Sequence, residues 1–194
     1  MTIIRDARTQ ASASVDDTFR LLTRSVTESE SQSATEEGDA FNLNTGIIAL
    51  SSSTESAIAY YQHNEESAFI IETIVVGVGS AGTTTDVSTV TLIRNPTAGT
   101  IISGASAGDI LQNRNFGSSK TLGASTFLKG AEGNTITGGD DFALFFQSAG
   151  GRLAAPLNIE LNKGDSIGVK VDTNTTSGST NVYSAIIGHL KAGV

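Results

Sequence analysis

The chain has 194 residues, of which 38% are hydrophobic, and its net charge at pH 7 is −8. This length and apolar content suffice for one buried core, so we expect one main domain. The acidic balance argues against binding of nucleic acid through phosphate contacts, which need clustered Lys and Arg, and the lack of Cys excludes disulfides and thiolate-bound zinc.

The N-terminal segment predicts a short helix over residues 13–26. Its apolar stripe, with steps of four, three and four residues, consists of Val15, Phe19, Leu22 and Val26. Ser14 and Asp17 have the spacing of a capping box at the start of this helix. Such a stripe either packs on the main domain or binds a neighbouring subunit as an arm. Its four residues are therefore our candidate partner-binding residues.

The next segment, 27–39, is rich in Glu, Ser and Thr and has no apolar period. Because it offers little surface to bury, we interpret it as an acidic linker. This gives an N-terminal arm over residues 1–39 and a β domain over residues 40–194. The early charges of both signs in 1–8, with no apolar run behind them, predict that no secretory signal is present.

From residue 40 onward, short apolar segments alternate with loops of Ser, Thr, Gly and Asn. The predicted strands are 46–51, 57–61, 69–78, 87–94, 100–103, 120–129, 143–147, 157–161, 167–171 and 182–190. One more strand is expected around Ile110, inside the long connection 104–116. Many short strands with Gly-rich turns indicate an antiparallel β-sandwich, and long connections between sheets favour a jelly roll. The most apolar window, 69–78, is too short to span a membrane.

The end of the chain carries the clearest alternation. Leu157, Ile159 and Leu161 alternate with polar residues, and the pattern resumes in 167–171 after the turn residues 162–165. We interpret these two segments as a hairpin, followed by a last strand over 182–190. The chain is therefore expected to close as antiparallel β-structure.

Two motifs suggest chemistry that their context does not support. Residues 77–82 spell the dinucleotide fingerprint, but β-branched residues follow where the phosphate-binding helix would have to begin, so we predict a hairpin loop there. Residues 104–108 match the nucleophile elbow around Ser106, but no helix is predicted after them. We therefore expect neither a nucleotide site nor a serine hydrolase.

The titratable residues also lack a pattern typical of catalysis. His63 and His189 are the only histidines, and their spacing matches no metal motif. The pair Asp140 and Asp141 follows two glycines and is predicted to lie in a turn. We therefore predict that the protein is not an enzyme and has no catalytic residue, cofactor or metal.

Two resemblances suggest a function. The closing segments, 157–171 and 184–190, resemble the end of jelly rolls of the tumour-necrosis-factor and complement-head type, which implies a homotrimer. The stretches 94–101, 113–120 and 129–139 resemble virion structural proteins of tailed bacteriophages. That resemblance implies a capsid decoration or cement protein on the virion surface, made in the host cytoplasm, which bridges subunits of the major capsid protein. It implies no catalytic residue, nucleic acid or membrane.

A second reading stays open. The chain could be a tail- or fibre-associated jelly-roll module that binds a host surface or a glycan. The lack of Trp and the low aromatic content, 6%, argue against a sugar site, because sugars stack on aromatic faces.

Overall fold

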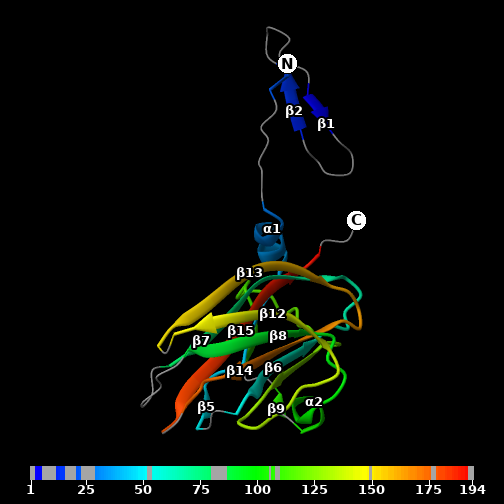
Figure 1. Cartoon of the computed structure of the whole chain (residues 1–194). Coiled ribbons are helices and arrows are strands. Elements are labelled where there is room, and N and C mark those ends of the chain that lie inside the picture. Colours follow the sequence, from blue (N-terminus) through cyan, green and yellow to red (C-terminus); the bar gives the residue numbers. More distant parts are fainter. Residues whose placement is uncertain are drawn as a thin grey trace.

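A computed structural model describes residues 3–5, 12–15, 21–22, 29–51, 54–79, 87–104, 106–107, 110–148, 150–175 and 178–191. The described residues form a small N-terminal sheet and two antiparallel six-stranded sheets, which pack face to face (Figure 1). The expected mainly β, sandwich-like architecture is therefore confirmed. We name the two large sheets after their central strands, the β15 sheet and the β14 sheet.

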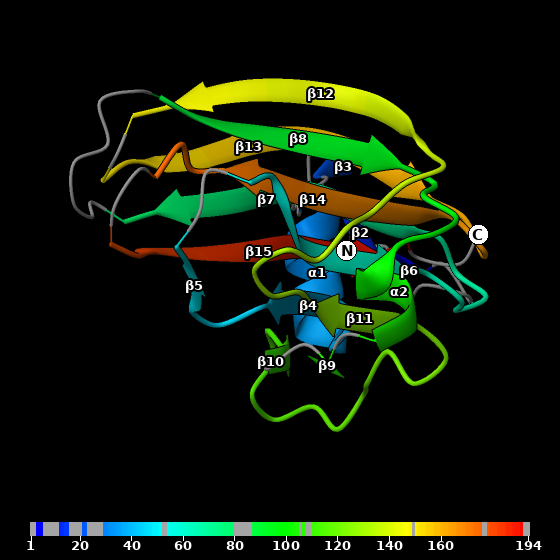
Figure 2. The same ribbon diagram turned by 60° about the horizontal axis from the view of Figure 1, so that its bottom comes forward.

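The strands of each large sheet come from distant parts of the chain. The β15 sheet has the order β10 (Ile110–Asn113), β4 (Ala40–Asn44), β15 (Thr180–Leu190), β7 (Phe69–Val78) and β13 (Arg152–Leu161), with β5 (Ile48–Leu50) also paired to β15. The β14 sheet has the order β12 (Asp140–Gln147), β8 (Ser88–Arg94), β14 (Ser166–Asp172), β6 (Ser56–Gln62), β11 (Thr126–Lys129) and β9 (Ser106–Ala107). Strands β12 and β13 are edge strands on the same side of the sandwich (Figure 2).

The core fills the space between the two sheets. It is built from alternate side chains of the strands, as the period-two pattern predicts. Its largest fully buried members include Phe41, Tyr61, Phe69, Ile71, Ile74 and Leu92. Each such side chain contributes roughly 1.5–3 kcal/mol on burial, which makes this core the main source of stability.

A second, smaller cluster lies on the face of the β14 sheet that points away from the core. It consists of Ala57, Tyr60, Ile93, Ile101 and Ile136. Ile101 belongs to the short helix α2 (Thr100–Gly104) and is fully buried. This segment was predicted as a strand, which is wrong. Gly99, at φ 131°, lets the chain turn, and its carbonyl accepts from the amides of Ile102 and Ser103 at 3.2 and 3.3 Å.

The predicted closing hairpin is also wrong in one respect. Its two strands form as β13 and β14, but β13 pairs with β7 and β14 pairs with β6 and β8, so they lie in different sheets. The turn exists, since the amide of Asp165 donates to the carbonyl of Asn162 at 2.9 Å. It carries the chain across the sandwich. The predicted hairpin loop after β7 likewise joins two sheets, because β8 does not pair with β7.

The N-terminal helix was predicted in the wrong place. Residues 12–15 and 21–22 form strands β2 (Ser12–Val15) and β3 (Leu21–Leu22), which make a small sheet with β1 (Ile3–Arg5). The stretch 12–15 alternates small polar and apolar residues, and this two-residue period takes the place of the helical one.

The helix lies instead in the segment that was interpreted as a linker. Helix α1 (Glu30–Glu37) begins after Ser29, whose hydroxyl accepts from the amide of Gln32 at 3.2 Å. It ends at Gly38, whose φ of 79° is a left-handed C-cap. Only Ala34 in this helix is buried, so capping and contacts with β15 and β4, rather than an apolar stripe, define the helix. The division into an arm and a β domain stays a prediction, although β4 does begin at Ala40.

Candidate assembly surface

An exposed apolar surface of the described chain lies on edge strand β12. Its alternate residues Ala143 and Phe145 pack on the core, so Leu144 and Phe146 point to the opposite, outer face of the β14 sheet. There Leu144 is 57% exposed and Phe146 is 67% exposed. Scattered apolar side chains are ordinary on protein surfaces, but two neighbours on one edge strand form an apolar row.

The residues beside this apolar row, on the neighbouring strands of the sheet, are polar. Across the sheet, Leu144 lies opposite Thr91 and Phe146 lies opposite Thr89. The next strand, β14, places Lys170 and Asp172 in the same two rows. Lys170 is held by an ion pair with Glu55 at 2.9 Å. The apolar row is therefore confined to the strand at the very edge, with a polar surface beside it.

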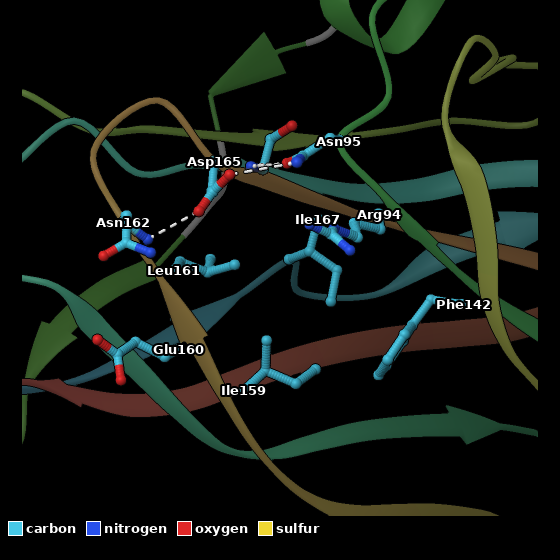
Figure 3. A pocket seen from close by; sticks show the side chains of 10 residues that line it. Arg94, Asn95, Phe142, Ile159, Glu160, Leu161, Asn162, Asp165 and Ile167 are labelled. Atoms are coloured by element: carbon cyan, nitrogen blue, oxygen red, sulfur yellow. Dashed lines mark hydrogen bonds between the residues drawn. The ribbon is translucent and has the colours of Figure 1, made fainter.

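A β-bulge gives Phe142 a different position. The register of β12 with β8 shifts between Asp141 and Ala143. Bulges of this kind re-aim a side chain. Phe142 lines a cavity of about 290 Å³ between the two edge strands, together with Ile159 and Ile167, and is 47% exposed (Figure 3). The same edge thus presents an apolar row on its outer face and an aromatic ring at the mouth of a cavity.

The polar rim of this cavity is organised by Asp165. Its carboxylate accepts from the amide of Asn162 at 2.9 Å and from the side chain of Asn95 at 3.2 Å (Figure 3). Asn95 has a φ of 46°, and its side-chain oxygen accepts from the amide of Ser166 at 2.8 Å. Arg94 also lines the cavity, and its guanidinium forms no hydrogen bond or ion pair within the described chain.

The predicted pair Asp140 and Asp141 does not lie in a turn. Both residues belong to β12, where their backbones lie opposite those of Arg94 and Ile93 in β8. The turn is made one step earlier by Gly138, at φ 76°, and Gly139. A side chain at Gly139 would meet the carbonyl of Arg94, which explains why two glycines precede the strand.

The candidate partner-binding residues from the sequence fall into two groups. Val15 ends β2 and Leu22 lies in β3, where Val15 pairs with Leu21 and Leu22 pairs with Ser14. Phe19 and Val26 lie outside the described residues. Val15 and Leu22 therefore lie in strands rather than on the predicted helix, and the role of the four residues in binding a partner stays a prediction.

The imidazoles of both histidines contact polar groups of neighbouring residues. His63 is fully buried; its Nδ1 lies 3.0 Å from the hydroxyl of Tyr61, and its Nε2 lies 2.8 Å from the carbonyl of Ser67. His189 lies in β15, with its Nδ1 2.8 Å from Glu72. Burial raises the pKa of Tyr61 above its usual range, so the phenol stays protonated and is able to donate to Nδ1 of His63.

The structure describes the surroundings of the two sequence motifs in part. Helix α2 precedes Ser106, and strand β9 contains it, whereas a nucleophile elbow needs a strand that leads into a helix. In 77–82, Gly77 lies beneath the ring of Tyr183, and residues 80–82 lie outside the described part. Among the described residues, no group of three or more His, Asp and Glu side chains is placed to hold a metal ion. None of the described helices is long and apolar enough to cross a membrane.

Sequence reasoning missed the β12 surface, although its signal is present. Residues 142–146 are all apolar, a pattern typical of a strand covered on both faces. The pattern does not reveal that the strand lies at an edge. No protein-family model, curated protein or solved structure significantly matches the chain.

Proposed function

We propose that the chain is a structural protein of a tailed-bacteriophage virion, a capsid decoration or cement protein that bridges subunits of the major capsid protein. The observation that carries an assembly role is the apolar row of Leu144 and Phe146, which is exposed on the isolated chain. Burying such a row against another subunit gains roughly 25 cal/mol per Å² of apolar area. The virion setting rests on the sequence resemblance.

We also infer that the sandwich is a jelly roll. Eight strands support this: β4 pairs with β15, β6 with β14, β7 with β13, and β8 with β12. The first strand thus pairs with the eighth, the second with the seventh, the third with the sixth and the fourth with the fifth. A long hairpin wrapped into two sheets produces this nested order, and jelly rolls are built of eight such strands.

The proposed mechanism is mechanical. Symmetric copies, proposed as homotrimers, would sit on the capsid surface and bury area against neighbouring subunits. Because ligands that bind only the assembled state stabilise it by mass action, each added contact raises the resistance of the shell to disruption. Specific contacts of this kind bury about 1,200–2,000 Å² in total.

Co-sedimentation with phage heads assembled without this chain tests the proposal. The purified protein is expected to bind the heads and to raise their temperature of disruption. The double variant Leu144→Lys and Phe146→Lys should lose binding, whereas Phe116→Lys, which alters a side chain that is 96% exposed elsewhere, should retain it. Wild-type protein that stays in the supernatant would count against a capsid role.

The cavity favours the alternative of a tail- or fibre-associated module that binds a glycan or host surface. Its half-exposed Phe142 ring offers a stacking face, and Arg94, Asn162 and Glu160 supply donors and acceptors around it. A glycan array distinguishes the two functions: signal that Phe142→Ala abolishes supports the module, and an array without signal removes this support.

A further inference from the structure

The two edge strands on the open side of the sandwich differ in how they are protected. Strand β13 contains Pro156, which lacks an amide donor, and its register with β7 shifts between Pro156 and Ile159. Within this irregular stretch Asn158 has a φ of 48°, and Glu160 is paired with Lys191 at 3.1 Å. Proline, bulges and charges are the devices by which proteins prevent an edge strand from pairing with another chain.

Strand β12 has none of these devices along most of its length. From Ala143 to Gln147 it continues in unbroken register with β8 and contains no proline and no charged residue. Strand β8 occupies one side of β12, and no other described strand pairs with its second side (Figure 2). A regular, apolar strand with an unpaired side is a template for pairing with a further strand.

An acidic residue at the start of β12 and a basic residue shortly after its end favour a second copy of the same chain in antiparallel orientation. Asp140 begins the strand, and Arg152 begins β13 just after the turn that follows β12. Neither side chain forms an ion pair within the described part of the chain. An antiparallel arrangement brings the acidic end of each copy beside the basic end of the other, whereas a parallel one would bring like charges together.

The side-chain alternation limits the possible registers. Directly opposite residues of antiparallel strands lie on the same face, so outer residues must meet outer residues. Placing Leu144 opposite Phe146 of the second copy matches both large outer residues at once, and it puts Phe145 on the two-fold axis. Pairing Leu144 with itself would place Phe146 opposite Phe142, which the bulge has turned toward the cavity.

From these observations we propose that β12 pairs with β12 of a second copy around a two-fold axis, joining two β14 sheets into one continuous sheet. The inference rests on the proposed function in that it names the partner of the same assembly surface. The two paired copies can belong to two different homotrimers, so the two-fold contact is compatible with the proposed trimer. The contact is isologous, so each copy contributes the same apolar pair and the same two charges.

Cysteine cross-linking tests the register, because the chain contains no Cys. Leu144→Cys and Phe146→Cys variants, carrying tags of different mass, are mixed and oxidised. The mixed disulfide is expected to form faster than the disulfide of either variant with itself, because opposite Cβ atoms lie about 4.5–5.5 Å apart. Equal rates for all three products, or no mixed product, would overturn the proposed pairing.

Light scattering tests the contact without cross-linking. The mass of the wild type is expected to be twice that of the Leu144→Lys and Phe146→Lys double variant, and Phe116→Lys should keep the wild-type mass. Circular dichroism verifies that the variants are folded, which their exposed positions lead us to expect. An unchanged mass in the folded double variant overturns the inference.

The two proposals fail in different ways. If the pairing is wrong but the assembly role is right, the double variant loses binding to phage heads although the Leu144→Cys and Phe146→Cys variants form no mixed disulfide. If the capsid role is wrong but the pairing is right, the mixed disulfide forms and the mass doubles, yet heads are not bound.

Discussion

The imidazole Nδ1 of His189 lies 2.8 Å from Oε1 of Glu72, on the face of the β15 sheet that α1 covers. Arg114 donates to the same carboxylate at 3.2 Å and to the hydroxyl of Ser31 in α1 at 3.2 Å. Glu30 of the helix lies 3.9 Å from Nε2 of His189. The carboxylate of Glu72 thus connects strands β7 and β15 with the loop after β10 and, through Arg114, with helix α1.

The stability of this connection should depend on pH through Glu72. Burial raises the pKa of Glu72, but bonds from Ser31 and His189 and the charge of Arg114 together lower it below its ordinary value of 4.5. Because the folded pKa is the lower one, the stabilisation is complete above about pH 4.5 and is lost as pH falls through the folded value.

Glu72→Gln should therefore lower the free energy of unfolding at pH 7 by about 1–2 kcal/mol, since it leaves Arg114 and His189 without their carboxylate. Thermal unfolding from pH 7 down to pH 3 measures this. The wild type should lose its advantage over the variant as the pH falls below 4.5. A constant difference across this range would contradict the assignment.

Tyr61→Phe should destabilise the protein by about 1–2 kcal/mol, because Nδ1 of the buried His63 then keeps only the hydroxyl of Ser125, at 3.4 Å. Urea unfolding measures the loss. Tyr60→Phe provides a matched control, because that tyrosine lies in the outer cluster and not in the histidine network. Equal losses in the two variants would show that the bond to His63 contributes little.

Gly130→Ala should be strongly destabilising. The new Cβ would lie within 2 Å of the carbonyl oxygen of Ala57, which is backbone in β6 and cannot move aside as a side chain can. Overpacking of this kind costs about 1–3 kcal/mol or more. Gly104→Ala, where nothing lies within 4 Å of the new Cβ, should change the melting temperature little.

Deletion of residues 1–28 should leave the sandwich folded and remove head binding if the N-terminal arm docks on the capsid. Ser29 then remains to cap α1. Deletion of 1–39 is a poorer test, because it also removes α1 and Asp39, whose carbonyl accepts from Leu190 at 2.8 Å. Retained binding in the shorter deletion would contradict the docking role of Val15, Phe19, Leu22 and Val26.

Local pattern predicted most strands. The strand 69–78 has the same bounds in sequence and structure, and those around 88–94, 167–171 and 182–190 differ by one or two residues at an end. Alternation sufficed there because each strand contributes every second side chain to one core. The strand expected near Ile110 is also confirmed.

Pattern did not reveal which strands are neighbours. Leu161 and Ile167 are separated by one turn and both face the core, but from opposite sheets, and a period of two is identical in either case. The exposed site was missed for the same reason. Phe142 to Phe146 would be buried in a central strand, and only pairing across the whole chain places them at an edge.

The nested pairing of the strands sets a condition on synthesis. Strand β15 lies between β4 and β7, so β4, the first strand of the sandwich to leave the ribosome, meets this one of its two neighbours more than a hundred residues later. Until then the edges of β4 and β7 that β15 will join lack their hydrogen-bond partners. The β15 sheet therefore cannot be completed until translation has passed residue 190, and a chain that stops earlier lacks the strand that joins β4 to β7.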